Sequence, residues 1–144
     1  MGGQRLRFEA VREGDEIPPL VVQNLTRTDL VRYAGASGDF NPMHHDQTFA
    51  EAAGNPTVFA HGMLSAGFLG KCVTDYVGAQ NLRRFKVRFA TRLWPGDTVT
   101  CRGRVTRKYL ADGEPRIDGE LQVLNQKGEV AIHGSFTAAV PPAS

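Results

Sequence analysis

The chain has 144 residues and a formal net charge of +2, with 41% hydrophobic and 22% charged residues. This length is enough for one domain to bury a core without disulfides or metal, and we expect residues 1–144 to form a single domain. The composition is typical of a globular protein and excludes a disordered, coiled-coil or collagenous chain. The small positive charge gives no argument for a nucleic-acid partner.

The cysteines and the start of the chain indicate a cellular location. Cys72 and Cys101 are the only cysteines and lack metal-ligand spacing, so we expect two small core residues in a reducing compartment. Residues 1–9 contain no apolar signal-peptide segment. The longest apolar stretch, residues 62–70, is too short to span a membrane. We therefore expect a cytoplasmic protein without a membrane span.

The first half of the chain, to about residue 77, is expected to form loops and helices. The pair Pro18–Pro19 blocks a helix, and the aliphatic residues 20–22 favour an extended segment. A helix is predicted over residues 26–34, because Thr26 is a good N-cap and Asp29 follows it three residues later.

Two further helices are predicted before residue 78. The first is a short helix over residues 46–53, with Asp46 as its N-cap and Gly54 as its stop. The second, over residues 61–77, is the longest and is apolar on almost all sides, which is typical of a buried helix. Its apolar residues include Met63, Leu64, Ala66, Phe68, Leu69, Val73 and Tyr76.

From residue 82 onward the hydrophobic pattern has a period of two. Phe85, Val87 and Phe89 alternate with basic residues, as on a strand whose aromatic face lies toward the core. Further strands are predicted over residues 98–109, 117–124 and 130–140, with turns at 95–97, 112–113 and 125–128. One buried helix followed by antiparallel strands predicts an α+β fold in which a sheet surrounds a helix.

Residues 33–50 contain the densest group of polar side chains. The group consists of Ser37, Gly38, Asp39, Asn41, Pro42 and His44. Gly38 and Pro42 predict an irregular loop, because glycine allows a positive φ and proline disfavours helix at the residue before it. On such a loop Asp39 and His44 can meet at one water molecule and share general acid–base work. The alternative is a surface turn in which Asp39 and Asn41 are only turn residues.

The start of the longest helix is a second candidate site. Gly62 lies there, where backbone N–H groups are free and the helix dipole is positive. Because glycine lets a ligand approach the backbone closely, the Gly62 N–H is a candidate oxyanion donor. His61 is expected to be a cap or a hydrogen-bonded core histidine rather than a catalytic group.

These residues resemble the MaoC-like hydratases, which include (R)-specific enoyl-CoA hydratases and related acyl-thioester dehydratases. The resemblance extends to about residue 140 and includes the turn at residues 93–97, although the sheet region matches only in general pattern. It implies a hot-dog fold, in which an antiparallel sheet wraps around a long helix. The segments that carry it are Tyr33, Ser37-Gly38-Asp39-Phe40-Asn41-Pro42-Met43-His44, Ala50 and Ala60-His61-Gly62-Met63.

The resemblance also implies roles for individual residues. Asp39 and His44 match the pair that holds the catalytic water, Asn41 matches a supporting residue, and the Gly62 N–H matches the donor to the thioester carbonyl. Ser37 matches a position that orients Asp39 or its loop. The implied reaction adds water to a trans-2-enoyl thioester, or removes it from a (3R)-hydroxyacyl thioester, with no cofactor. We prefer Asp39 as the base and His44 as orienting group and proton donor, and the reverse division stays open.

The sequence also leaves some binding features open. Arg84, Lys86 and Arg88 form either a solvated strand face or a patch for coenzyme A phosphates or an acidic acyl carrier protein. No metal is expected, because the adjacent ligands His44 and His45 lack the spacing of known sites.

The resemblance further implies a homodimer, with a heterodimer of two different hot-dog subunits as the alternative. Two other functions compete with hydration. One is an acyl-thioesterase on the same fold, and the other is a non-catalytic partner subunit of a dehydratase.

Overall fold

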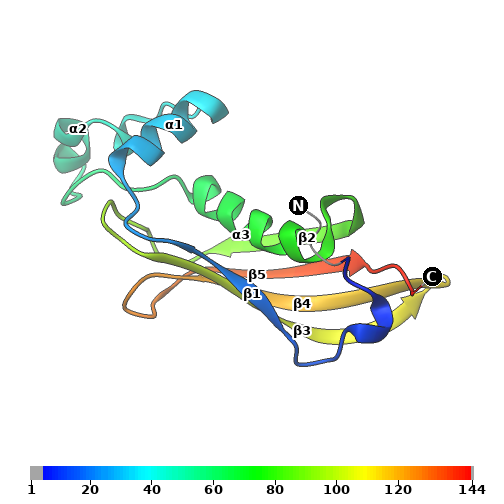
Figure 1. Ribbon diagram of the computed structural model, residues 1–144. Helices are drawn as coiled ribbons and strands as arrows, with labels where there is room; N and C mark the ends of the chain where they lie inside the picture. Colours follow the sequence, from blue (N-terminus) through cyan, green and yellow to red (C-terminus); the bar gives the residue numbers. More distant parts are fainter. Residues whose placement is uncertain (1–4, 144) are drawn as a thin grey trace.

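The computed structural model describes residues 5–143, and its framework is an antiparallel sheet packed against one long helix (Figure 1). The five strands lie in the order β1-β3-β4-β5-β2, so β1 and β2 form the edges of the sheet. The strands are β1 (Glu16–Val22), β2 (Leu82–Phe89), β3 (Val99–Ala111), β4 (Glu114–Leu124) and β5 (Val130–Ala139). The helices are α1 (Arg27–Ser37), α2 (Gln47–Ala52) and α3 (Gly62–Val77), with short 3₁₀ helices η1 (Phe8–Ala10), η2 (Pro42–His44) and η3 (Ala79–Asn81).

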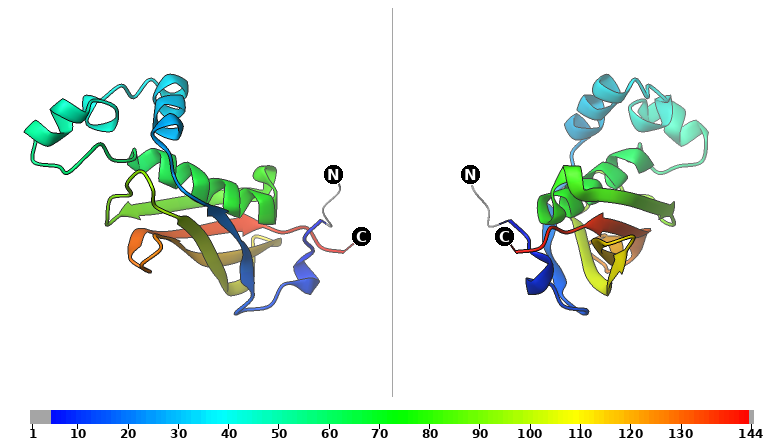
Figure 2. Two further views of the ribbon diagram at one scale, coloured as in Figure 1. Left: turned by 60° about the vertical axis from the view of Figure 1, so that its left-hand side comes forward. Right: turned by 90° about the vertical axis from the view of Figure 1, so that its right-hand side faces the viewer.

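Helix α3 organises the core. It contacts all five strands, and the sheet curves beneath it, while α1 and α2 lie on the same side of the sheet as α3, near the start of that helix (Figures 1 and 2). The buried residues of α3 recur every three or four positions, so that one face of the helix meets the sheet. They are Ser65, Ala66, Leu69, Cys72, Val73 and Val77. The predicted α+β layout is therefore confirmed.

Both cysteines lie in this core, as expected from the sequence. Cys72 on α3 and Cys101 on β3 are free and buried. Burial raises the pKa of the Cys101 thiol to about 12, so this thiol stays protonated at neutral pH and behaves as a small apolar residue.

Helix α3 is not buried on all sides, which corrects one expectation. Met63 is 58% exposed. It begins a stripe of exposed residues at intervals of four, which continues through Gly67, Lys71 and Asp75. Lys71 and Asp75 form an ion pair of 2.7 Å along this stripe. The sequence did not predict this exposed stripe, because Met63 and Gly67 are not polar residues.

The position of Phe89 corrects a second expectation. Phe85 and Val87 pack against the core as predicted, but Phe89 is 51% exposed. Phe89 is the last residue of the edge strand β2, so its ring has a strand neighbour on one side only. The alternation of residues predicted correctly which face of β2 lies toward the core. It did not predict that the ring at the end of this face, that of Phe89, stays half exposed.

The N-terminal half contains a strand that was expected only in part. The extended segment begins at Glu16 instead of residue 20 and includes Pro18 and Pro19. Its pairing with β3 shifts register between Ile17 and Leu20. Prolines lack the N–H that a ladder needs, so they are tolerated here because β1 is an edge strand.

The predicted helix ends are largely confirmed. Thr26 and Asp29 form a reciprocal capping box at the start of α1, and Asp46 caps α2. Helix α1 runs three residues further than the predicted end at Ala34, through Ser37, and Gly38 ends it with a φ of 78°. No helix of residues 5–143 is both long enough and apolar enough to cross a membrane.

Gly119 tests the packing on the inner face of the sheet. A Cβ at this position would overlap the ring of Phe136 and lie 2.8 Å from the Arg104 carbonyl oxygen. Because Phe136 is fully buried, we expect Gly119→Ala to lower the free energy of unfolding by about 1–3 kcal/mol. Denaturant titration measures this change.

A matched control is Gly35→Ala in the exposed part of α1, where an added Cβ meets no atom within 4 Å. This change is expected to stabilise the helix by roughly 0.5–1 kcal/mol. Equal stability of the Gly119→Ala and wild-type proteins would contradict the close packing of Phe136 on β4.

Candidate active site

The loop after α1 positions the Asp39 carboxylate. Gly38 adopts the left-handed conformation, which turns the chain at the end of the helix. The Ser37 hydroxyl donates to the Tyr33 carbonyl oxygen at 2.7 Å and accepts from the Asp39 N–H at 3.1 Å. Ser37 thus links the last turn of α1 to the backbone of Asp39.

Asn41 acts within the same loop. Its N–H donates to Asp39 Oδ1 at 3.2 Å, and its side-chain oxygen accepts from the Met43 N–H at 3.0 Å. Pro42 then begins the 3₁₀ helix η2, which ends at His44. Asn41 therefore supports the site through the loop conformation, because its N–H binds the carboxylate and its amide caps η2.

His44 has a defined tautomer. Its Nδ1 lies 2.6 Å from the carbonyl oxygen of Phe59, and a carbonyl can only accept, so Nδ1 carries a proton. In the neutral ring Nε2 is then an acceptor. The edge of the Phe59 ring packs against His44 with 5.0 Å between centroids. The ring is buried, whereas the Asp39 side chain is exposed and open to water.

His61 is part of the same cluster, which the sequence did not predict. Its ring is 1% exposed and stacks on His44 with 3.9 Å between centroids and 29° between planes. The Nε2 atom lies 3.1 Å from the Asp39 carbonyl oxygen. Burial lowers the pKa of His61, and the nearby His44 lowers it further, while the hydrogen bond to the Asp39 carbonyl raises it.

The expectation that His61 is a cap or a hydrogen-bonded core histidine holds only in part, because the ring is buried and one of its two nitrogens is hydrogen-bonded. His61 occupies the N-cap position of α3, but its side chain makes no capping hydrogen bond. Its buried Nδ1 has no hydrogen-bond partner among residues 5–143. The available signal was its place next to Gly62, but composition and spacing could not show which side of the helix start it faces.

Gly62 is the first residue of α3 and lies next to this cluster. Its N–H belongs to the first turn, where helix geometry provides no acceptor, so it can bind a ligand oxygen. A Cβ at this position would lie 2.9 Å from Phe89 Cε1, so only glycine fits without moving the ring.

A pocket of about 180 Å³ opens beside Gly62. Its lining consists of Phe59, Ala60, Gly62, Ser65, Phe89, Ala90, Thr91, Arg92, Leu93, Ala131 and Ile132. The walls are mostly apolar, which suits an acyl chain. Phe59 connects this pocket to His44, because it lines the pocket and its carbonyl accepts a hydrogen bond from the His44 ring.

The cluster of Asp39, His44 and His61 offers one ligand atom each within 4.8 Å of one another. The two imidazole planes are stacked, so their lone pairs run side by side rather than toward one point, as tetrahedral zinc requires. The two residues that follow His44 in the sequence have other contacts: His45 bonds to the Phe40 carbonyl and Asp46 caps α2. The geometry is better suited to holding water than a metal ion.

The structure does not bring the basic run of β2 to this site. Arg84, Lys86 and Arg88 are exposed and alternate with the core-facing side chains of the strand. They pair with Thr137, Ser135 and His133 of β5, on the face of the sheet opposite α3.

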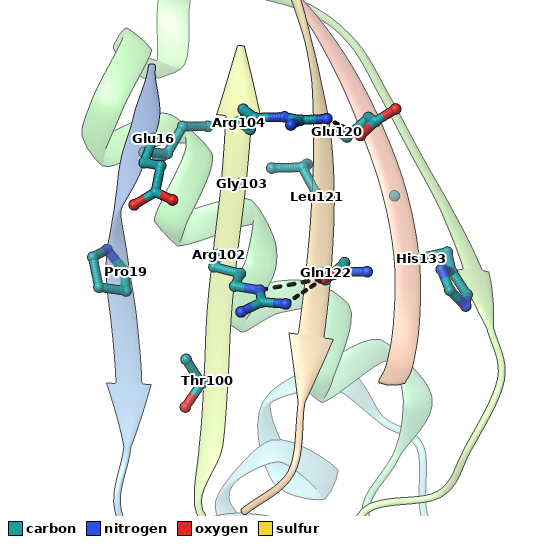
Figure 3. Close-up of a pocket in the computed structure, with 12 residues that line it drawn as sticks. Glu16, Pro19, Thr100, Arg102, Gly103, Arg104, Glu120, Leu121, Gln122 and His133 are labelled. Carbon is teal, nitrogen blue, oxygen red and sulfur yellow. Dashed lines mark hydrogen bonds and ion pairs between the residues drawn. The ribbon is translucent and has the colours of Figure 1, made fainter. Parts of the chain in front are cut away.

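The same outer face has a shallow hollow of about 910 Å³ (Figure 3). Both arginines of this hollow have partners on the same face of the sheet. Arg102 donates to Gln122 at 3.1 Å, and Arg104 forms an ion pair with Glu120 at 3.4 Å. The hollow lies across the sheet from the Asp39 cluster, so we do not assign it to the same site.

The sequence matches the MaoC like domain family over residues 9–129. The chain belongs to this family. It is 30% identical to an (R)-specific enoyl-CoA hydratase from Rhodospirillum rubrum, a match that covers 93% of this chain and 91% of that protein. The resemblance seen in the sequence is thereby confirmed for the family.

Two further comparisons address length and fold. The chain is 32% identical to a peroxisomal hydratase-dehydrogenase-epimerase from Neurospora crassa over 79% of its own length, but it spans only 13% of that longer protein. The structure is similar to an unliganded R-hydratase from Pseudomonas aeruginosa, with a TM-score of 0.86, 23% identity and coverage of 96% of this chain and 88% of that chain. This likeness confirms the hot-dog fold.

The lowered pKa of His61 predicts how stability depends on pH. The unfolded chain binds a proton near the ordinary pKa of 6.5, and the folded protein does not until the pH is lower. Folding stability is therefore fully present above about pH 6.5 and decreases as the pH falls below it. Denaturant unfolding at about pH 5.5 and pH 7.5 measures this slope.

The control for this measurement is His61→Gln, which has no titratable group at the position. We expect a smaller loss of stability between the two pH values in this variant. An identical loss in wild type and variant would show that His61 does not contribute.

Proposed function

We propose that this protein catalyses the reversible hydration of trans-2-enoyl thioesters to (3R)-hydroxyacyl thioesters, carried on coenzyme A or an acyl carrier protein. The supporting observation is that side-chain atoms of Asp39, His44 and His61 lie within 4.8 Å of one another, and that His61 directly precedes Gly62, the first residue of α3. The Rhodospirillum rubrum relative is named for this type of activity.

The thioester is activated at Gly62. Its N–H donates to the carbonyl oxygen of the substrate, which draws electron density from the double bond and makes C3 electrophilic. A single donor of this kind typically contributes about 3 kcal/mol to transition-state stabilisation. The acyl group extends into the pocket beside Phe89.

The catalytic water lies between two acceptors. Since Nδ1 of His44 binds the Phe59 carbonyl, the neutral ring offers Nε2 as an acceptor, and the Asp39 carboxylate is the second. A water that donates to both directs a lone pair toward C3 of the enoyl group.

The hydrogen bond of His44 favours it as the base, which is the reverse of the division preferred from the sequence. Neutral His44 cannot donate from Nε2 before it has taken up a proton. As the water oxygen bonds to C3, His44 accepts a water proton and then delivers it to C2. Asp39 orients the water and stabilises the imidazolium. Both protons and the oxygen of the water are thus accounted for, without a cofactor.

Replacement of Asp39 tests this mechanism. Wild type is expected to reduce the enoyl-thioester absorbance of crotonyl-CoA and of a longer 2-enoyl-CoA. Asp39→Asn removes the charge that orients the water, and we expect kcat to fall by roughly 100-fold or more. The matched control is Asp46→Asn, which keeps an N-cap on α2 and should leave kcat unchanged.

Thiol release is followed in parallel to separate the competing functions. Release of free thiol without hydration would favour the acyl-thioesterase, in which water attacks the thioester carbon. If neither reaction occurs with purified protein, the non-catalytic partner subunit becomes the better explanation. Full activity of Asp39→Asn would contradict the acid–base mechanism.

We propose a homodimer, with a second type of hot-dog subunit as the alternative partner. Strand β2 is an edge of the sheet and can pair with another chain, and Met63 and Phe89 expose apolar surface beside it. Sedimentation is expected to give twice the 15.7 kDa chain mass. A monomer at assay concentration would contradict this proposal.

Some finer features remain proposals. Arg84, Lys86 and Arg88 are exposed, as a carrier contact requires, but only binding experiments can test that role. Residues 1–144 are proposed to act as one domain. The cytoplasmic location stays a prediction, supported by the two free cysteines.

A further inference from the structure

We infer that His61 is a positioning residue, which holds Asp39 and His44 in a fixed relation to the Gly62 N–H. This inference rests on the proposed function. His61 directly precedes Gly62 at the start of α3, yet its side chain contacts the loop 22 residues earlier. One residue therefore links the oxyanion donor to the acid–base pair.

The first link is to the backbone of Asp39. The Asp39 carbonyl only accepts, so His61 Nε2 carries the proton and donates to it at 3.1 Å. The Asp39 N–H donates to the Ser37 hydroxyl, and Asp39 Oδ1 accepts from the Asn41 N–H. Hydrogen bonds thus hold both the N–H and the carbonyl of Asp39. The bond to the carbonyl comes from His61, which lies outside the loop.

The second link is to the His44 ring. The His61 and His44 rings stack with 3.9 Å between their centroids. Tyr33 packs edge-on against the His61 ring, with 4.8 Å between centroids. The hydrogen bond from His44 Nδ1 to Phe59 controls one end of the His44 ring, and the stacking limits its rotation. Together they direct Nε2 toward the water position.

The unpaired Nδ1 of His61 indicates that this residue serves more than stability. A buried acceptor without a partner is unfavourable for folding. Burial lowers the pKa of His61 and so favours the neutral ring, in which the proton that Nε2 donates leaves Nδ1 unprotonated. A neutral ring adds no positive charge beside the imidazolium that forms on His44 during the reaction. The other ionisable groups around it are Asp39, His45 and Tyr33.

Two substitutions separate the two links. His61→Phe keeps a ring for stacking but removes the donor to Asp39, whereas His61→Gln keeps an N–H donor near the Nε2 position but removes the ring. We expect His61→Phe to lower kcat at least tenfold, with KM for crotonyl-CoA within about twofold of wild type. We expect His61→Gln to recover part of kcat.

The matched control is the neighbouring His45, which is exposed and bonds only to the Phe40 carbonyl. His45→Phe and His45→Gln should leave kcat unchanged. The pH profile of kcat adds a readout that a purely structural role would not move. We expect its apparent pKa values to shift in the His61 variants and to stay constant in the His45 variants.

Amide hydrogen exchange provides a test that does not require activity. In His61→Phe the N–H groups of Asp39 and Asn41 are expected to exchange faster, while the thermal midpoint stays close to that of wild type. Failure of the proposed function would appear as no hydration by wild type. An active wild type with unchanged kcat and unchanged loop exchange in His61→Phe would overturn the positioning role, as would a loss of kcat that only parallels unfolding.

Discussion

The packing of α3 against the inner face of the sheet is the constraint on which the site depends. Its buried residues contact all five strands, so the position and direction of the helix are set by the whole core. The helix begins near one end of the sheet (Figure 1), and its first residue, Gly62, is exposed. The dipole and the free donors of that turn then act at one fixed place.

The loop that carries Asp39 and His44 is held by two kinds of contact, local and long-range. Local hydrogen bonds from Ser37 and Asn41 shape the loop around Asp39, within four residues along the chain. Long-range contacts then attach the loop to the rest of the protein: His44 binds Phe59, 15 residues away, and His61 binds Asp39, 22 residues away. The first kind determines the loop conformation, and the second determines where its side chains point.

The two faces of the sheet have different tasks. The inner face buries α3 and has glycines at close contacts: Gly119 leaves room for the Phe136 ring of β5, and a Cβ at Gly134 would lie 3.3 Å from Leu69 of α3. The outer face carries polar pairs such as Arg102 with Gln122 and Arg104 with Glu120 (Figure 3), together with the exposed cations of β2. The pocket beside Gly62, which is proposed to hold the acyl group, instead lies at the start of α3 and has mostly apolar walls.

The sequence alone determined the features that arise from neighbouring residues. The capping box of Thr26 and Asp29, the cap at Asp46 and the turn at Gly38 follow from local chemistry, and the spacing of Asp39 and His44 follows from the motif. Only the tertiary structure decided the exposure of Met63 and Phe89 and the contacts of His61. These depend on which elements cover each other and on contacts between distant segments, and periodicity or composition contains no information about either.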